Sequence, residues 1–583
     1  MPLIPFIPEN APFTADQRQW LNGWLAGLFS DASGGLAANA MAGVCAVPAK
    51  QLTVLYGSQT GTAEGLAKKA GTEAKKRGFA PKLVCMDKFE SVDLAKEENV
   101  LVIMSTYGDG EPPDNALAFW NYLKSETAPP LPQLHFSVLA LGDTNYSAFC
   151  EFGKKCDERF EQLGAKRVHP RIDCDVDYDA PAKAWTDGVF TALAGTASVS
   201  TTTEAAPAET GYSKKNPFPA RLLANLLLNA PGSGKEVRHY EISLEGSGLS
   251  YEVGDALGML PSNCPVLVGD LLAALGCDGE EAVKTPDGAE TPLRFALLQH
   301  YDIVKPSPDL LRAAADRSAS EEFKSLLDPA RKDDLKKFLW GREIIDVVAG
   351  LAQPFRADEF IALLKRLQPR LYSISSSPKA HPSEVHLTIG AVRYESHGRA
   401  RKGVASTFLA DRAGDATPVP VFVQVSHGFR LPENGDVPVI MCGPGTGIAP
   451  FRAFLEEREV VGAKGRNWLL FGDQKRASDF LYREQLEVWL ASGHLARLDL
   501  AFSRDQAEKI YVQNRMLENA AELWAWLQDG AHFYVCGDAS RMAKDVDAAL
   551  HTIAETAGGL SAEAAAEYVA KLKSEKRYQR DVY

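Results

Sequence analysis

The feature that most constrains the fold is a repeated alternation of short apolar strands and amphipathic helices between residues 52 and 193. Strands are expected at residues 52–56, 83–86, 100–105 and 136–141, and the first helix at residues 62–77. This alternation predicts a doubly wound parallel sheet with helices on both faces. Because such sheets bind ligands at the carboxyl ends of their strands, the loops that follow the strands are the candidate binding loops.

The first of these loops joins a strand to a helix N-terminus and is rich in glycine and hydroxyl residues. Its candidate phosphate-binding residues are Ser58, Gln59, Thr60, Gly61 and Thr62. Backbone N–H groups and hydroxyls at a helix N-terminus suit a phosphate. The loop lacks the lysine of the GxxxxGK[ST] motif, so a nucleoside triphosphate is disfavoured and a flavin monophosphate is favoured.

Two further loops follow their own strands and carry aromatic residues. The candidates in the second loop are Ser105, Thr106, Tyr107 and Gly108. Those in the third loop are Gly142, Asp143, Asn145, Tyr146, Phe149 and Cys150. Tyr107 and Tyr146 can enclose a flat ring between them. A single Gly/Asp/Ser loop is a common surface turn, but three loops that each follow a strand strongly indicate a site.

These loops resemble the flavodoxin-like domain of the diflavin reductases, which holds FMN. The resemblance implies that the first loop binds the FMN phosphate and that Tyr107 and Tyr146 stack on the flavin ring. It also implies an acidic surface near the flavin edge. Candidate residues for that surface are Asp109, Glu111, Asp114, Asp143, Asp173, Asp175 and Asp177. Charge alone favours the alternative interpretation, a solvated acidic face without a partner.

The region 212–432 is expected to be an antiparallel FAD-binding barrel with a helical connecting insertion at about residues 265–367. Strands are predicted at residues 237–244, 371–376, 384–392 and 419–425, and helices in the insertion include residues 293–300 and 359–367. Turn residues between short alternating strands favour a barrel.

Two stretches of this region suit a flavin dinucleotide. The candidates in the first are Arg370, Leu371, Tyr372, Ser373 and Ser375, which offer a guanidinium for a pyrophosphate, an aromatic ring and hydroxyls. The second is a glycine turn that enters a helix, with the candidates Gly403, Val404, Ala405 and Ser406. A serine-rich edge strand without a ligand and a merely capped helix are the alternatives.

The last region, 433–583, is predicted to be a second parallel sheet that binds NADPH. A strand at 439–442 enters a GxGxG turn with Gly445 and Thr446, a helix follows at 451–459, and further strands are expected at 468–471, 498–502 and 532–536. Cationic and hydroxyl side chains after these strands indicate a site for NADPH, which carries a 2′-phosphate, rather than a site for NAD. The candidates for this phosphate are Ser503, Arg504, Lys509, Tyr511 and Gln513, and Asp545 is a further candidate for binding the cofactor. The alternative is a basic surface turn.

The last two regions resemble the ferredoxin–NADP reductase half of the diflavin reductases, so the resemblance extends from about residue 51 to residue 583. It implies that Ser373, Cys536 and Asp581 surround the hydride-transfer site and that Tyr583 covers the FAD. The ending 577–583 and the tryptophan-bearing segment 23–28 resemble the sulfite reductase branch of that family.

This resemblance implies an NADPH-dependent oxidoreductase that uses FMN, FAD and NADPH. Electrons would pass from NADPH to FAD, to FMN and then to a sirohaem and iron–sulfur sulfite reductase haemoprotein subunit. A reductase of another haem or metalloprotein acceptor is the alternative with the same chemistry. A non-catalytic flavin-binding assembly protein is the alternative from a different class.

Composition excludes several other classes. The formal charge of −13 argues against nucleic acid and anionic membrane as partners and favours a basic partner surface. Nine cysteines without a CxxC pair indicate reduced thiols in a cytoplasm, with neither a disulfide framework nor a metal site. Cys150 and Cys156 form a C-x5-C pair, but the C-x3-C pair of a sirohaem and iron–sulfur site is missing. No stretch is apolar enough for a membrane span.

The remaining segments are an N-terminal region and a linker. Residues 1–48 are predicted to contain a helix at 14–29, in which Trp20 and Trp24 need a covering surface, followed by a flexible connector at 34–43. The helix either docks on this chain or makes a subunit contact in a homo-oligomer. Residues 49–195 form the predicted FMN-binding domain. Residues 196–211 form the predicted linker, which would keep that domain close to its partners.

Overall fold

A computed structural model describes residues 50–583, except 59–60, 108–109, 145–147, 176–177, 195–210, 415 and 427. Apart from Lys50, these residues belong to the unit Gln51–Tyr583. The predicted N-terminal helix, the connector and nearly all of the predicted linker lie outside this range.

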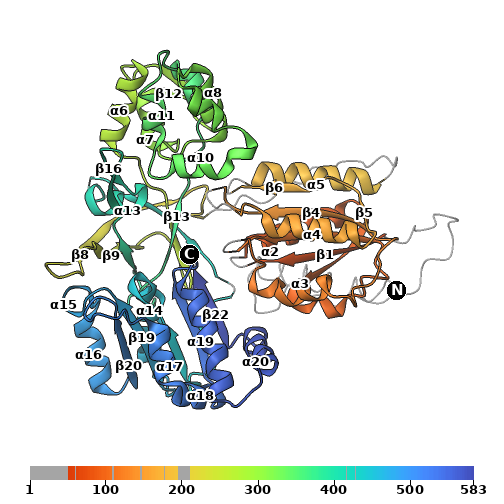
Figure 1. The fold of residues 1–583 in the computed structure, drawn as a ribbon, viewed down its shortest axis with the longest axis vertical. Helices are drawn as coiled ribbons and strands as arrows, with labels where there is room; N and C mark the ends of the chain where they lie inside the picture. The colour runs from red at the N-terminus through yellow and green to blue at the C-terminus, as the bar shows by residue number, and fades with distance from the viewer. Residues whose placement is uncertain are drawn as a thin grey trace, which may run out of the picture. The chain divides into compact units, whose positions relative to one another are not determined.

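The first part of the unit is a six-stranded sheet of order β2-β1-β3-β4-β5, with β6 paired to β4 (Figure 1). The strands are β1 (Lys50–Gly57), β2 (Phe79–Cys85), β3 (Asn99–Ser105), β4 (His135–Leu141), β5 (Lys166–Arg167) and β6 (Ile172–Cys174). The pairs of β3 with β1 and β4, and of β4 with β5 and β6, are parallel. This is the flavodoxin-like strand order, so the predicted fold class is confirmed here.

Helices cover both faces of this sheet because its central strands are buried on both sides. Val100, Val102 and Met104 of β3 share one core with helices α3 (Leu117–Lys124) and α4 (Glu151–Gln162). Leu101 and Ile103 share the opposite core with α2 (Thr62–Lys76) and α5 (Asp179–Ala194). Two 3-10 turns, η2 (Met86–Ser91) and η3 (Asp114–Ala116), complete the connections.

The second part is an antiparallel barrel built from two sheets. One has the order β13-β10-β17-β7 and the other the order β14-β9-β8. Their strands are β7 (Phe218–Ala220), β8 (Leu222–Leu227), β9 (Val237–Ser243), β10 (Ala256–Met259), β13 (Arg370–Ser373), β14 (Glu384–Gly390) and β17 (Val419–Gln424). A bridge between Ile374 and Leu387 joins the sheets around a shared core. The hairpin β15 (Arg393–Ser396) and β16 (Arg399–Lys402) leads into α13 (Val404–Asp411).

Two predicted strands of the barrel are shorter than expected. The strand predicted at 371–376 ends at Ser373, because Ser375, Ser376 and Ser377 are fully buried and bind polar groups outside the sheet. Ser377, for example, donates its backbone N–H to Glu456 at 3.0 Å. The strand predicted at 384–392 ends at Gly390, and a hairpin begins at Arg393.

The insertion between β10 and β13 is helical, as predicted, and has its own apolar core. Its helices are α6 (Pro265–Leu275), α7 (Leu293–Gln299), α8 (Pro308–Arg317), α9 (Glu321–Ser325), η4 (Pro329–Arg331), α10 (Lys332–Leu339), α11 (Ile344–Val348) and α12 (Ala357–Ala362). A small hairpin joins β11 (Ala282–Lys284) to β12 (Glu290–Pro292). The buried guanidinium of Arg401 in β16 pairs with Glu343 at 3.0 Å and Asp346 at 2.6 Å, which ties the insertion to the barrel.

The third part is a parallel five-stranded sheet of order β20-β19-β18-β21-β22. The strands are β18 (Val439–Cys442), β19 (Asn467–Asp473), β20 (Arg497–Phe502), β21 (His532–Gly537) and β22 (Tyr578–Val582). The predicted fold class is confirmed here also. The C-terminal strand β22 was not predicted, and it lies beside β21 at the edge of the sheet.

Two cores enclose this last sheet, one on each face. Helices α14 (Ala449–Val460) and α16 (Arg483–Ser492) pack on one face. Helices α17 (Val512–Glu518), α18 (Ala520–Gln528), α19 (Met542–Thr556) and α20 (Ala562–Ser574) pack on the other. The short elements η5 (Gly445–Ile448) and α15 (Arg476–Asp479) follow β18 and β19. Among the described residues, no helix combines the length and apolarity that crossing a membrane requires.

Candidate active site

Three of the predicted catalytic residues meet at one carboxylate. Asp581 in β22 lies opposite Cys536 in the paired strand β21. The hydroxyl of Ser373, at the end of β13, donates to Asp581 Oδ2 at 2.5 Å. The Cys536 thiol lies 3.8 Å from the same oxygen. Residues from the barrel and from the C-terminal sheet therefore converge on Asp581.

The electrostatics of this cluster follow from burial. Burial raises the pKa of the Asp581 carboxyl above its ordinary value, and the hydrogen bonds from Ser373 and Cys536 oppose that shift. Burial also raises the pKa of the Cys536 thiol well above its ordinary value. Cys536 is therefore protonated at neutral pH and acts as an S–H donor to Asp581 rather than as a thiolate nucleophile.

The fourth predicted catalytic residue, Tyr583, lies against the glycine turn. Its backbone N–H donates to the carbonyl of Gly537 at 3.1 Å. Its hydroxyl is 3.1 Å from the hydroxyl of Thr446 in η5. The residue is 58% exposed, so it can leave this position without opening the core.

Two glycines of the turn after β18 are required for different reasons, one for its close packing and one for its backbone conformation. A Cβ on Gly447 would lie 2.2 Å from the carbonyl oxygen of Cys536, and Gly445 has a φ of +59°. Lys235 and the buried carboxylate of Asp473 form an ion pair of 2.5 Å beside Gly445. Glycine backbone that a ligand can approach closely, beside the ammonium group of a lysine, is suited to binding the pyrophosphate of a dinucleotide.

The residues predicted to bind the 2′-phosphate follow β20. The backbone N–H groups of Ser503 and Arg504 donate to the carbonyls of Asp473 and Gln474, which fixes the start of the loop. Arg504, Lys509 and Tyr511 have exposed side chains, as a site for a solvent-borne phosphate requires.

Gln513, the next residue of this predicted set, connects two helices. Its side-chain amide donates to Asp545 Oδ2 at 3.0 Å, which links α17 to α19. These two predicted residues therefore meet.

The predicted FAD residues of β13 are presented along one strand. Arg370 donates through Nη1 to the backbone carbonyl of Gln368 at 2.8 Å, a contact that leaves its charge uncompensated. Leu371 is 48% exposed, and burial raises the pKa of Tyr372 to about 12. Ser375 differs from these residues because it is fully buried, and its carbonyl accepts a hydrogen bond from Arg452 at 2.6 Å.

The second predicted FAD stretch is the N-terminus of α13. Gly403 is the N-cap, and a Cβ there would lie 2.8 Å from the Cβ of Val392. The hydroxyl of Ser406 accepts from the backbone N–H of Val392 at 3.1 Å. Val404 and Ala405 lie in the first turn, whose N–H groups have no partner inside a helix. A helix N-terminus with a guanidinium elsewhere in the same barrel fits a pyrophosphate.

The first predicted FMN loop has the expected strand-to-helix form. Gly61 has a φ of +82° and is the N-cap of α2, which begins at Thr62. The hydroxyl of Ser58 accepts from the N–H of Ala63 at 3.2 Å. Gln59 and Thr60 lie outside the described residues.

The second predicted FMN loop begins with two hydroxyl residues at the carboxyl end of β3. The buried hydroxyl of Ser105 has no hydrogen-bond partner within the part of the chain that the structure describes. An unsatisfied buried hydroxyl at this strand end fits a bound polar group. Thr106 accepts from the N–H of Phe152 at 3.3 Å. Tyr107 is half-buried and exchanges two backbone hydrogen bonds with Glu111. Gly108 is not described.

The third predicted FMN loop ends at a residue with a strained backbone conformation. Cys150 has a φ of +53°, which is uncommon for a non-glycine residue, and it is the buried N-cap of α4. A Cβ on Gly142 would lie 2.8 Å from the Cys150 nitrogen. Burial raises the pKa of the Cys150 thiol to about 12. Asp143 and Phe149 flank Asn145 and Tyr146, which are outside the described range.

Comparisons with known proteins agree with these three parts. A flavodoxin model matches residues 54–185, an FAD binding domain model matches residues 211–408, and an oxidoreductase NAD-binding domain model matches residues 441–548. The sulfite reductase (NADPH) flavoprotein alpha-component of Bacillus subtilis is 47% identical, over 100% of this chain and 97% of the relative. The proteins of the same name from Vibrio cholerae and Photobacterium profundum are 46% and 44% identical, over 98% and 99% of this chain and 93% and 96% of theirs.

The chain belongs to the sulfite reductase (NADPH) flavoprotein alpha-component family. Membership confirms the predicted family, and it confirms that the chain is an NADPH oxidoreductase with FMN, FAD and NADPH as cofactors. The roles assigned to individual residues stay predictions.

The ion pair of Lys235 and Asp473 was not predicted from the sequence. Asp473 ends strand β19, as Ser503 follows β20, and a carboxylate at the end of a parallel strand was a usable signal. Lys235 comes from the barrel and is distant from Asp473 in sequence, so no local pattern linked the two.

Proposed function

We propose that this chain is the NADPH-dependent electron-transferring component of a sulfite reductase and that it delivers electrons to a separate sirohaem haemoprotein subunit. The full-length similarity to sulfite reductase (NADPH) flavoprotein alpha-components supports this proposal. The observation that carries its chemistry is the convergence of Ser373, Cys536 and Asp581, because it joins the predicted FAD strand to the predicted NADPH sheet at a single carboxylate.

When bound, the cofactors would supply the redox chemistry, namely hydride transfer from the nicotinamide and electron transfer through the two flavins. The protein positions these groups. Arg370, Tyr372 and the N-terminus of α13 would hold FAD, and the loops at the ends of β1, β3 and β4 would hold FMN. The turn at Gly445 and Thr446, with Arg504 and Lys509, would hold NADPH.

The cluster at Asp581 has a positioning role in this proposal. Ser373 fixes one carboxylate oxygen at 2.5 Å, and the protonated Cys536 supplies a second, weaker donor. The carboxyl group is thereby held at one place, and the two hydrogen bonds favour its charged form against the larger opposing effect of burial. In that form it would orient the carboxamide of a nicotinamide or stabilise the positive charge that develops on its ring. Tyr583 would occupy the nicotinamide position until NADPH displaces it.

The partner is expected to present a basic surface. Glu111 is exposed at the end of the second FMN loop, whereas Asp114 is half-buried and pairs with Arg580 of the same chain. Opposite charge on the haemoprotein would steer the encounter and make it sensitive to salt. We propose in addition that the protein works in the cytoplasm and that the N-terminal segment 1–48 mediates assembly into a homo-oligomer.

The experiment that tests the acceptor uses purified protein loaded with FMN and FAD. NADPH oxidation and sulfide formation are measured with and without a sirohaem sulfite reductase subunit, and NADH is compared with NADPH. Sulfide that forms only with both proteins and NADPH supports the proposal. Rapid cytochrome c reduction without sulfide formation would contradict this acceptor and favour another metalloprotein.

A further inference from the structure

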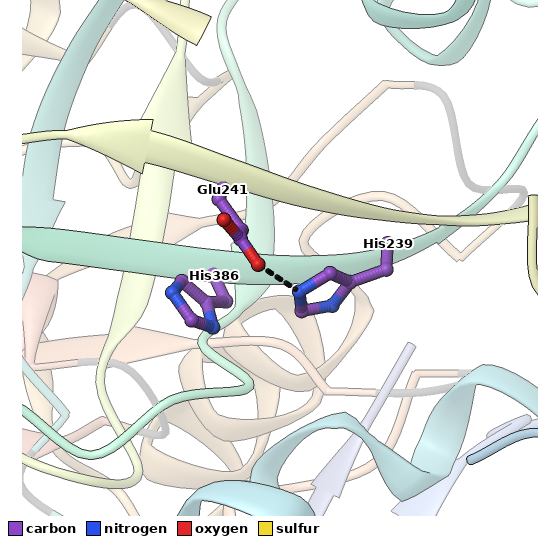
Figure 2. A group of neighbouring side chains, drawn as sticks. All are labelled: His239, Glu241 and His386. Atoms are coloured by element: carbon purple, nitrogen blue, oxygen red, sulfur yellow. Dashed lines mark hydrogen bonds and ion pairs between the residues drawn. The ribbon is translucent and has the colours of Figure 1, made fainter. Parts of the chain in front are cut away.

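A cluster of two histidines and one glutamate lies on one face of the barrel sheet (Figure 2). His239 and Glu241 are two residues apart on β9, so their side chains point to the same face. In the antiparallel register, His386 of β14 lies directly opposite Glu241. The pairing of two strands therefore brings together three side chains that no short sequence motif contains.

The three side chains offer ligand atoms at close range. One ligand atom from each lies within 4.8 Å of the other two. The Nε2 atom of His239 is 3.3 Å from Glu241 Oε1, and the two imidazole rings are nearly perpendicular, with centroids 5.0 Å apart. Zinc bonds of about 2.1 Å in tetrahedral geometry place ligand atoms about 3.4 Å apart.

Outer contacts orient both rings, as in known metal sites. His239 Nδ1 is 2.9 Å from the hydroxyl of Tyr482, which in turn is 2.6 Å from the hydroxyl of Thr388. This contact directs His239 Nε2 toward Glu241. His386 Nε2 lies 3.1 Å from a carboxylate oxygen of Glu384. Tyr482 itself has a φ of +54°, so a strained residue supplies the outer contact of His239.

The charges around the cluster are compatible with a bound cation. The guanidinium of Arg452 lies 3.5 Å from His386 Nδ1, the nitrogen that remains for a metal once Nε2 contacts Glu384, so a bound cation has to displace this contact. Arg452 also pairs with Glu456 at 2.6 Å. Glu241 and Glu384 then leave the site with excess negative charge. Both histidines are buried.

We propose that His239, Glu241 and His386 form a binding site for a divalent transition cation, with Zn²⁺ as the preferred occupant. Two imidazole nitrogens and one carboxylate oxygen are a common zinc donor set that leaves a fourth position for water. Hard cations such as Mg²⁺ and Ca²⁺ prefer all-oxygen sites and fit this set poorly.

The site has a structural consequence for the predicted FAD stretch. The carbonyl of His386 accepts from the N–H of Ser375 at 2.8 Å, and the N–H of His386 donates to the hydroxyl of Ser376 at 2.9 Å. Fixing His386 therefore fixes the segment that follows β13. Bound Zn²⁺ raises the melting temperature of the holoprotein and slows its loss of FAD.

A second arrangement of ligands competes with the proposed one. His381 and Glu384 also lie within 4.8 Å of His386. His381 is more exposed than His239, and its Nε2 is already 3.6 Å from Glu456. The comparison of Glu241 with Glu384 therefore separates the two arrangements.

The test titrates ZnCl₂ into untagged, chelator-treated holoprotein in competition with a chromogenic zinc chelator. We expect one equivalent to bind with a micromolar or lower Kd, and we expect His239→Gln and Glu241→Gln to weaken binding at least tenfold. Glu384→Gln removes the outer contact of His386 and should weaken binding less than Glu241→Gln does. His551→Gln, which alters a surface histidine paired with Asp547, serves as the histidine control and should bind Zn²⁺ within about twofold of the unaltered protein.

Absence of stoichiometric binding, or loss of binding in Glu384→Gln with retention in Glu241→Gln, would overturn the proposal. X-ray absorption at the zinc edge of the unaltered protein gives an answer that does not depend on the folding of variants. Imidazole and oxygen ligands support the site, whereas sulfur ligands would assign the metal to cysteines and contradict it. Neither measurement uses enzymatic activity, so failure of this proposal is distinguishable from failure of the proposed function.

Discussion

The hydrogen bond from Ser373 to Asp581 permits a quantitative prediction for Ser373→Ala. A hydrogen bond to a charged group contributes about 1.5–3 kcal/mol. The bond here is 2.5 Å long and comes from a partly buried donor. We expect this hydrogen bond to stabilise the transition state of hydride transfer. Its loss then slows the reduction of the bound flavin by about 10- to 150-fold, at 1.36 kcal/mol for each factor of ten in rate.

The same substitution changes the pH dependence. The Ser373 hydroxyl favours the charged form of Asp581 and so lowers the pKa of its carboxyl, whereas burial raises it. Removing the hydroxyl leaves the burial effect less opposed, so the pKa of Asp581 rises further. The variant therefore loses activity at a higher pH than the unaltered enzyme as the solution is acidified.

Stopped-flow absorbance of flavin reduction by NADPH, measured across pH, gives both quantities. Ser377→Ala is the matched control, because the Ser377 hydroxyl donates to Glu457 at the same distance of 2.5 Å and lies four residues further along the chain. We expect the control to keep the unaltered rate and pH profile. Equal rates and superimposable profiles for Ser373→Ala and the unaltered enzyme would refute the assigned role of Asp581.

Three further predictions concern binding and stability. Arg504→Ala should weaken NADPH binding by roughly tenfold to a hundredfold and leave NADH binding almost unchanged, as measured by titration, and an equal effect on both nucleotides would contradict a 2′-phosphate contact. Arg401→Ala leaves the carboxylates of Glu343 and Asp346 without their cation and should lower the free energy of unfolding by about 3–5 kcal/mol, as measured with denaturant. The control Arg312→Ala breaks an exposed ion pair and should lower it by less than about 1 kcal/mol. Gly142→Ala places a methyl group against the Cys150 backbone, so the variant should retain less FMN after desalting. The control Gly269→Ala lies in α6 with open space around it. It should keep full FMN content and raise the free energy of unfolding by about 0.5–1 kcal/mol.

The elements that sequence predicts well are those with a strong local pattern. The strand at residues 439–442 is a continuous apolar run, and the structure places β18 at the same residues. Helix α2 begins at Thr62, after the positive φ of Gly61, as its glycine and hydroxyl loop indicates. The flavodoxin-like order of the first sheet follows from such elements, because parallel connections are right-handed and short.

Other elements depend on contacts that the local sequence does not carry. Strand β22 contains Gln579, Arg580 and Asp581, so it lacks an apolar pattern, and pairing with β21 is what makes it a strand. The shortening of β13 follows from the burial of Ser375 against Arg452, a residue of helix α14.

The same limit applies to the sites. Resemblance to a family placed Ser373, Cys536 and Asp581 together, and no spacing rule would have done so. The group of His239, Glu241 and His386 depends on the register of β9 and β14, which the sequence alone does not specify.

The central claim is that electrons pass through both flavins in a fixed order, and the most direct test removes FMN alone. Protein that retains FAD but lacks FMN is mixed with NADPH, and flavin reduction and electron delivery to the sirohaem subunit are followed separately. We expect FAD reduction by NADPH to persist, electron delivery to the haemoprotein to stop, and added FMN to restore that delivery. Electron delivery at an undiminished rate without FMN would contradict the proposed order of electron transfer.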